Sequence, residues 1–410
     1  MGRNNKRKEK RSKNLVLICT LTAIILIVST YAWFIGLRSV SVASFDVEIA
    51  STDSLLLSLD GKKWSTQVNI NKGNYNDPNV VYSGNTNSWT TGLIPMSTVG
   101  NMDSDTSRMV LFEKASFTAT KGGYRVMASK VDNATSEHKG YVAFDLFVKN
   151  FSGTQYIKEY NPLDEEAIYL TTDSSVFVPN DGVKNTGIEN SVRVAFAQVG
   201  RVSGTTTTVD TITGIKCQND ANVTSICRQA QIWEPNDTQH VESAINWYNT
   251  SYKVRTDKEI EKDSSYSAAN CTQIENGVAY PTYAIKDNVA SGDYVDIYDG
   301  NQVNGVYNNY NANLNKVTNF PYFTDTMKNL PGLNRPQLMT LAPNSITKLR
   351  VYIYIEGQDV DNYDFAQIGK KIAVNFGFTK ERFETEDVGY TGPSFNVPAP
   401  NNNIVYELNN

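Results

Sequence analysis

Three aspartates in one short segment are the residues best suited to binding a metal ion. Asp359, Asp361 and Asp364 lie in EGQDVDNYDF, directly after an apolar strand-like segment. Calcium takes about six to eight oxygen ligands, and carboxylates supply them. The spacing does not match the D-x-[DN]-x-[DN]-G pattern of a helix-loop-helix calcium site. These three residues are therefore calcium candidates, with a solvated turn that bonds its own backbone as the alternative. A second acidic segment, GDYVDIYDGN, is a weaker candidate through Asp293, Asp296, Asp299 and Asn301.

Histidine is too scarce for the common hydrolytic sites. The chain has two histidines, His138 and His240, and a zinc peptidase of the HExxH type needs two on one helix face. GxSxG, Walker and GxGxxG motifs are absent from the sequence. Nothing in the sequence brings two carboxylates together as in a glycosidase. We predict no catalytic residues and no enzymatic activity, with both histidines as polar surface residues in loops.

Cysteine usage leaves three alternatives open. Cys19 lies in an apolar segment, and Cys217, Cys227 and Cys271 follow it. Cys217 and Cys227 are the nearest pair and would close a short loop if they formed a disulfide. Free thiols are the second alternative. Metal ligation is the third, although the CxxC spacing and neighbouring histidines of a zinc site are missing. No cofactor is expected apart from calcium.

The N-terminus has the charge pattern of a membrane anchor. Residues 1–13 hold seven basic side chains and one acidic one, and residues 14–37 carry no charge. About 20 apolar residues span a bilayer, and flanking basic residues stay in the cytoplasm. We predict a single-pass membrane protein with a cytoplasmic segment 1–13, a membrane span 14–37 and an extracellular remainder. The alternative is a cleaved signal peptide, cut after Ala32 or Ala43, that releases the protein.

The charge of the chain disfavours nucleic-acid binding. The formal net charge is −5, and because residues 1–13 contribute +6, the rest carries −11. A nucleic-acid-binding protein would show a basic patch. No nucleic-acid partner is expected.

Period-two alternation predicts the fold class. Segments 54–60, 141–148, 191–197, 349–355 and 372–378 place apolar residues on one face, which is typical of strands with one buried face. In the fourth segment the opposite face carries Arg350, Tyr352, Tyr354 and Glu356. We predict a mainly β protein: an N-terminal transmembrane helix followed by an antiparallel, jelly-roll-like β-sandwich with a long polar insertion.

The domain boundaries follow from composition. Residues 44–200 are expected to form the first part of the sandwich and 341–382 its last strands. Residues 201–340 form a polar insertion or small subdomain, and 383–410 an extended tail. Within the insertion, Asp237 or Thr238 is expected to cap a helix that carries Val241, Ala244, Ile245 and Tyr248. The Tyr-rich stretch 294–323 is either a contact surface for glycans or packing for the insertion.

Several segments resemble a family of exported bacterial proteins. They are STYAWF (29–34), LLLSLDGKKW (55–64), YVAFDLFVKN (141–150), SVRVAFAQ (191–198), IWEPNDTQH (232–240) and LAPNSITKLRVYIYIEGQDVDN (341–362). Together they are similar to the camelysin/TasA-like surface proteins of Gram-positive and related bacteria, which have a SipW-dependent signal type. The resemblance covers the N-terminus and the β core but not 255–330 or the tail. It implies a jelly-roll-like sandwich at the cell surface. Some relatives polymerise into matrix fibres, and camelysin has been described as a metallopeptidase.

These observations together favour a non-enzymatic surface protein. We expect a structural, biofilm-matrix or adhesion role, with partners in the membrane, in other surface or matrix components, or in further copies of the chain. The alternatives are a metal-dependent surface peptidase of the camelysin type and a glycan- or peptide-binding module.

Overall fold

The computed structural model describes residues 42–51, 55–70, 93–120, 123–153, 155–159, 165–254, 272–280, 282–289, 295–298, 301–302, 316–330, 335–363 and 370–382. The chain divides into two compact units, Met1–Ser39 and Val40–Asn410, and all described residues belong to the second. The predicted anchor 14–37, the tail 383–410 and Asp364 lie outside the described residues. Within the described ranges, no helix has the length and apolar character needed to cross a membrane.

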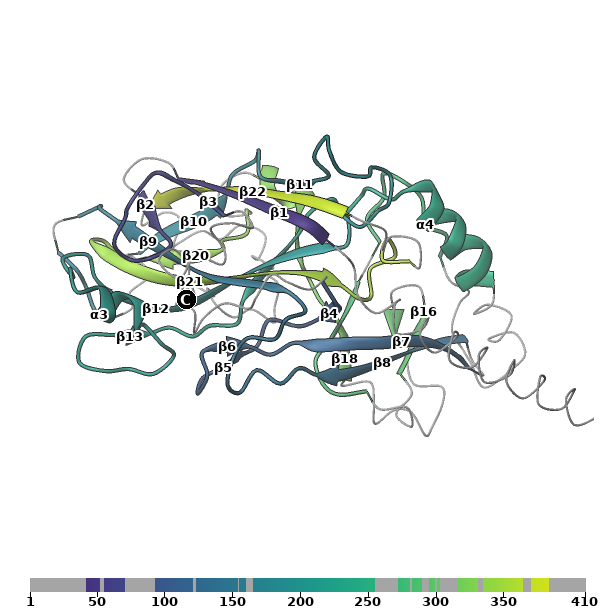
Figure 1. The fold of residues 1–410 in the computed structure, drawn as a ribbon, viewed down its shortest axis with the longest axis horizontal. Helices are drawn as coiled ribbons and strands as arrows, with labels where there is room; N and C mark the ends of the chain where they lie inside the picture. The colour runs from purple at the N-terminus through teal and green to yellow at the C-terminus, as the bar shows by residue number, and fades with distance from the viewer. Residues whose placement is uncertain are drawn as a thin grey trace, which may run out of the picture. The chain divides into compact units, whose positions relative to one another are not determined.

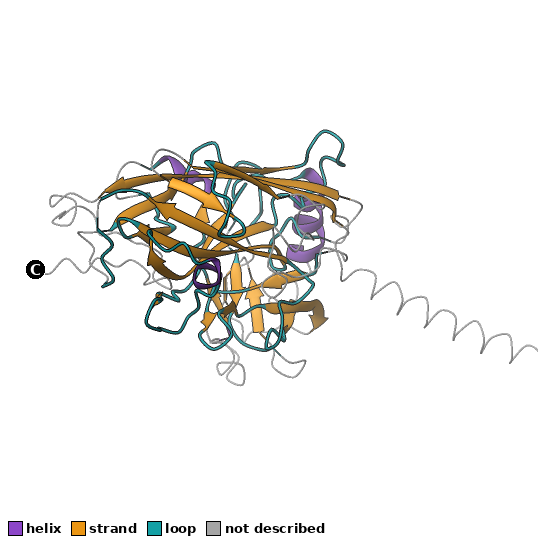
Figure 2. Cartoon of the chain, turned by 60° about the vertical axis from the view of Figure 1, so that its left-hand side comes forward, coloured by secondary structure: helices purple, strands orange, loops and turns teal. Residues whose placement is uncertain are grey.

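The fold is mainly β, as predicted, and its curled strands form two large sheets (Figure 1, Figure 2). The first sheet has the strand order β20-β10-β22-β1-β3, and β11 also pairs with β22. Its strands are β1 (Val42–Ser51), β3 (Gln67–Ile70), β10 (Glu166–Leu170), β11 (Ser175–Phe177), β20 (Met339–Leu341) and β22 (Lys370–Arg382).

The second sheet is larger and has β21 and β12 at its centre. Its order is β17-β16-β8-β7-β4-β21-β12-β14-β19, with β9 paired to β21 and β2, and β13 to β12. Its strands are β2 (Leu55–Ser58), β4 (Pro95–Ser97), β7 (Phe112–Thr120), β8 (Gly123–Lys130), β9 (Val142–Asn150), β12 (Val192–Ser203), β13 (Thr224–Ser225), β14 (Gln231–Glu234), β16 (Val295–Tyr298), β17 (Asn301–Gln302), β19 (Phe323–Thr324) and β21 (Ser345–Glu356). Two small two-stranded sheets accompany it, formed by β5 (Met102–Asp103) with β6 (Arg108–Met109) and by β15 (Tyr283–Ile285) with β18 (Val317–Asn319).

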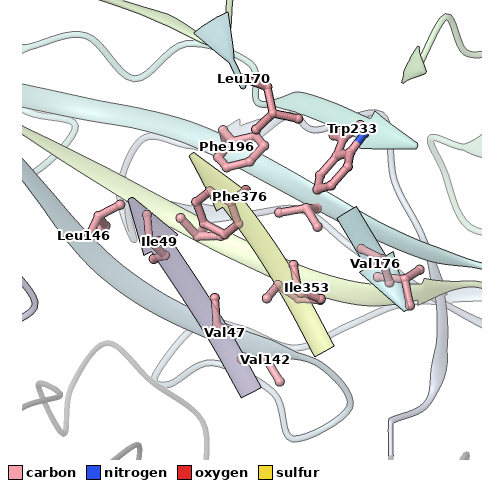
Figure 3. Close-up of a cluster of buried hydrophobic side chains, with 14 of the residues drawn as sticks. Val47, Ile49, Val142, Leu146, Leu170, Val176, Phe196, Trp233, Ile353 and Phe376 are labelled. Carbon is pink, nitrogen blue, oxygen red and sulfur yellow. The ribbon is translucent and has the colours of Figure 1, made fainter. Parts of the chain in front are cut away.

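The two large sheets pack face to face around one apolar core (Figure 3). Ile49 and Phe376 project into it from the first sheet, and Leu146, Phe196 and Ile353 from the second. The rings of Phe196 and Phe376 meet edge to face with centroids 5.2 Å apart. Burying each such side chain contributes about 1.5–3 kcal/mol, so this interface supplies much of the stability of the sandwich.

The prediction of a purely antiparallel sandwich is wrong for three strand pairs. β1 runs parallel to β22, from Val42 opposite Lys370 to Ser51 opposite Phe378. β4 and β21 are parallel, as are β14 and β19. Parallel neighbours need long connections, and β1 and β22 lie at opposite ends of the described chain. The alternation within a strand does not encode its direction.

The prediction of one buried face per strand is also wrong for the central strands. Every residue of β21, including Arg350 and Glu356, is buried, and β12 is buried from Val192 to Val202. The second face of these strands packs in another apolar cluster, where Tyr352 and Tyr354 join residues such as Met96 and Ile232. Strand β21 therefore lies between two cores, and the polar residues on its second face do not face solvent.

The predicted helix is present but begins later than expected. Helix α4 (Glu242–Trp247) has Val241 at its N-cap and continues as the π-helix η2 (Tyr248–Tyr252). Neither Asp237 nor Thr238 is its cap. Ala244 is buried as its spacing predicts. The described residues also form the short helix α3 (Val209–Thr213) and the 3-10 helix η4 (Asp325–Asn329).

Cys217 and Cys227, which are ten positions apart in sequence, form a disulfide with Cα atoms 5.0 Å apart. Of the three alternatives for this pair (a disulfide, free thiols or metal ligation), the structure shows the disulfide. Both cysteines pack in or against a cluster with Val199 and Val223. Cys271 lies outside the described residues.

Replacing both disulfide cysteines, as Cys217→Ser with Cys227→Ser, should lower the free energy of unfolding by about 2–3 kcal/mol. The reason is that the unfolded chain regains the freedom of a short closed loop. Urea denaturation of the purified protein measures the change. An unchanged midpoint in the double variant would show that the bond contributes nothing to stability.

Candidate functional site

The acidic segment after β21 is closed inside the protein. Asp359 and Asp361 have 8% and 0% of their surface exposed. Asp359 Oδ2 lies 2.6 Å from the Arg193 guanidinium, and Asp359 Oδ1 accepts a hydrogen bond from Ser191 Oγ at 3.4 Å. The segment thus forms an ion pair with Arg193, a side chain of β12.

Arg193 balances more than one carboxylate. Glu234 of β14 forms an ion pair with the same guanidinium nitrogen that contacts Asp359. The Arg193 guanidinium also lies over the Tyr322 ring, 5.0 Å from its centroid, and donates a hydrogen bond to the backbone oxygen of Asn190 at 3.1 Å. Because the side chain is fully buried, it needs these partners to offset its desolvation.

Two carboxyl groups around Arg193 have pKa values close to neutral pH. Burial penalises the charged form and raises the pKa values of Glu234 and Glu356 to about 7, although Arg193 opposes the shift in both. Tyr322 Oη donates to Glu356 Oε2 at 3.0 Å, and the backbone N–H of Gln358 donates to Oε1 at 3.0 Å. The cluster can therefore gain or lose protons near neutral pH.

Asp361 connects the acidic segment to the start of α4. Its Oδ2 lies 2.7 Å from His240 Nδ1, and its Oδ1 accepts from the backbone N–H of Val241 at 3.1 Å. The second ring nitrogen, Nε2, lies 3.0 Å from the carbonyl oxygen of Val278. Burial lowers the pKa of His240, but the hydrogen bond and charge of Asp361 outweigh it, and the net shift is upward.

His240 was expected on the surface, and that prediction is wrong. Its residue surface is 8% exposed, because the turn before α4 folds over Asp361. His138 is partly buried in a loop, where its Nδ1 accepts from the backbone N–H of Gly140 at 3.2 Å. The sequence offered an Asp five positions after a buried strand and a His just before a helix, but their 121-residue separation hid the pairing.

A second buried ionic cluster lies nearer the start of β21. Arg350 makes two hydrogen bonds to Asp145 of β9, at 2.7 and 3.1 Å, and Lys348 Nζ lies 3.0 Å from Asp145 Oδ2. Burial raises the pKa of Asp145, but these two cations outweigh it and lower the pKa overall. Tyr352 Oη donates to Glu137 Oε1 at 2.9 Å, which ties the loop before β9 to the same face.

A third pair repeats the pattern at the far end of β12. Arg201 and Glu165 are each 1% exposed and form an ion pair. The guanidinium also donates to the backbone oxygens of Lys158 and Glu159, at 3.1 and 3.2 Å.

The three aspartates proposed as calcium ligands do not share one set of contacts. Asp359 is engaged by Arg193 and Asp361 by His240, and Asp364 lies outside the described residues. Asp293 and Asp299 also lie outside them, while Asp296 lies in β16. Across the described ranges, no three His, Cys, Asp or Glu side chains are placed to hold a metal ion. Calcium binding that involves Asp364 stays a prediction.

The buried ion pairs connect distant parts of the chain. Arg193, Lys348 and Arg350 meet carboxylates of other segments, so the contacts hold β12 and β21 against β9, β14 and the segment after β21. A comparison with known families, curated proteins and solved structures found no match. The resemblance to the camelysin/TasA-like family therefore stays a prediction.

Replacing Arg193 by Met should lower the free energy of unfolding by about 3–5 kcal/mol, because Glu234 and Asp359 would remain buried without their cation. Urea denaturation at pH 8 measures the loss. The matched control is Lys371→Met. Lys371 pairs with Asp181 with 35% and 64% of their side chains exposed, and such a pair contributes at most about 1 kcal/mol. Equal losses in the two variants would contradict the account.

The raised pKa values of Glu234 and Glu356 predict that stability falls as pH rises. From about pH 4.5 to 7 the folded state retains protons that the unfolded carboxyl groups have released. At about 1.4 kcal/mol for each pKa unit, each group loses up to about 3 kcal/mol over this window. Denaturation between pH 5 and pH 8 measures the slope. Glu356→Gln, which mimics the neutral acid, should flatten it, and a wild-type stability that rises over the window would refute the assignment.

Proposed function

We propose that the chain is a membrane-tethered surface protein with a structural role in the cell envelope, matrix or adhesion, and that it has no enzymatic activity. The observation that carries this proposal is the paired state of the buried ionisable groups. Arg193, Arg201 and Arg350 each meet carboxylates inside the fold, so these groups brace the structure and do not face a substrate.

Two further observations support export. The Cys217–Cys227 disulfide is of the kind that persists outside the cytoplasm. The basic segment 1–13 followed by the uncharged segment 14–37 is the pattern of a signal anchor with its C-terminal side outside. We also propose that this mainly β fold is a jelly-roll-like sandwich, which the face-to-face packing of the two sheets supports.

The peptidase alternative is less well supported. It would use His240, which already has a partner at each ring nitrogen, Asp361 and the carbonyl oxygen of Val278. Binding a zinc ion there would break one of these hydrogen bonds and expose a buried residue. The glycan-binding alternative depends on the Tyr-rich stretch 294–323, much of which lies outside the described residues.

Surface proteolysis tests the location. In cells that produce the chain with an epitope at each end, added protease should remove the C-terminal epitope and leave the N-terminal one, because we place only residues 1–13 in the cytoplasm. Cells permeabilised before digestion are the control, in which both epitopes should disappear. Protection of the C-terminal epitope in intact cells would refute the proposed topology.

The absence of catalysis is tested on the purified chain. Casein should remain intact with or without a chelator, and His240→Ala should behave as the wild type. Chelator-sensitive casein digestion that the substitution abolishes would overturn the non-enzymatic proposal and favour the peptidase.

A further inference from the structure

Lys380, Glu166 and Asn150 form a compact set of reactive side chains between the two sheets. Lys380 Nζ lies 3.0 Å from Asn150 Oδ1 and 3.2 Å from Glu166 Oε2. Asn150 Nδ2 donates to the same Glu166 oxygen at 2.6 Å. An amine, a carboxamide and a carboxylate are thus in mutual contact.

The strand register explains why the three meet. Lys380 of β22 stands opposite Ile168 of β10, and Glu166 is two residues from Ile168 on the same strand. Ile168 belongs to the core between the sheets, so Lys380 and Glu166 project from the first sheet toward that core. Asn150 ends β9 two residues after the core residue Val148, and it projects toward the core from the second sheet.

The surroundings exclude most water. Asn150 is 0% exposed, and the side chains of Lys380 and Glu166 are 13% and 10% exposed. Their strand neighbours on the core face, Ile168 and Phe378, are fully buried. In such a site hydrogen bonds are strengthened and hydrolysis is suppressed.

We propose that Lys380 and Asn150 join in an intramolecular isopeptide bond, with Glu166 as the proton carrier. The proposed structural role does not require this self-modification, so the result for the isopeptide bond neither supports nor refutes that role. The ordinary alternative is an ion pair with two hydrogen bonds and no covalent change.

The reaction is a group transfer that needs no cofactor or oxidant. Glu166 first accepts a proton from the Lys380 ammonium, and the free Nζ attacks Asn150 Cγ. In the tetrahedral intermediate Glu166 passes that proton to Nδ2, the Cγ–Nδ2 bond breaks, and ammonia leaves. The same carboxylate then moves the extra proton of the new amide nitrogen to the ammonia, so the products are an Nζ–Cγ amide and ammonium, with Glu166 in its starting state.

The amide of Asn150 is already held in a suitable orientation. Its Oδ1 accepts hydrogen bonds from Ser152 N–H at 3.2 Å and Ser152 Oγ at 3.1 Å. These donors would stabilise the negative charge that develops on the oxygen during attack. Its Nδ2, the leaving group, faces Glu166 and the carbonyl oxygen of Ala342 at 3.1 Å. The nucleophile and the oxyanion donors therefore meet Oδ1 of the amide, and the proton carrier meets its Nδ2.

The bond would connect the two sheets covalently. It joins β9 of the second sheet to β22 of the first, across 230 positions of sequence. Loops of this length lose the most unfolded-state freedom on closure, so the link would strongly resist unfolding.

Peptide mass spectrometry of the full-length chain, purified from its membrane fraction and digested with trypsin, tests the proposal. Lys380 should resist cleavage, and peptide 150–158 should appear joined to peptide 372–382. The joined species should weigh about 17 Da less than the sum of its parts, the mass of one ammonia lost in the substitution. Reading the peptides makes the result independent of N-terminal processing and of the disulfide.

Two variants and one control establish the mechanism. Lys380→Arg removes the nucleophile and Glu166→Gln removes the proton carrier, and both should abolish the joined peptide while circular dichroism shows a β spectrum. Lys371→Arg, on the same strand, should retain it. If wild-type protein yields peptides 150–158 and 372–380 separately, with Lys380 cleaved, the proposal is wrong and the three side chains form only non-covalent contacts.

Discussion

A guanidinium inside a protein is tolerated only where carboxylates face it, and this constraint shapes the second sheet. Arg193 and Arg201 on β12 and Arg350 on β21 are fully or almost fully buried. Each draws a carboxylate from elsewhere in the chain, and leaving one unpaired would cost about 3–5 kcal/mol. The segments that carry these carboxylates are therefore held at fixed places on the sheet. The same contacts cover the face of β21 that would otherwise meet solvent.

Alternating hydrophobicity was sufficient to predict the mainly β class and the positions of the main strands, because a sandwich core requires apolar residues at every second position. It could not predict the second core. Arg350 and Tyr352 alternate with valine and isoleucine in the same way whether they face water or a buried ionic layer. The pairing of β1 with β22 was equally hidden, since direction and partner depend on connections hundreds of residues long. Helix α4 was placed correctly, but its start depends on Asp361, which is distant in sequence.

The sequence singled out Asp359 and Asp361 as calcium candidates by their residue type and clustering, but it gave no indication of which side chains surround them. Their partners, Arg193 and His240, lie more than a hundred residues away, and only the fold reveals that the carboxylates bind protein cations. Lys380, Glu166 and Asn150 carried no sequence signal at all, because a lysine, a glutamate and an asparagine on separate strands form no local motif.

We infer that the buried ion pairs make the sandwich and the segments that cover it one cooperative unit. Hydrogen–deuterium exchange of the purified protein, read segment by segment, tests this cooperativity most directly. We expect the backbone amides of residues 356–362 and of β14 to exchange as slowly as those of β12 and β21, because they can open only with the sheet. Fast exchange in 356–362 and β14 beside a protected β12 and β21 would contradict the claim, since it would show that the ion pairs open locally and hold nothing together.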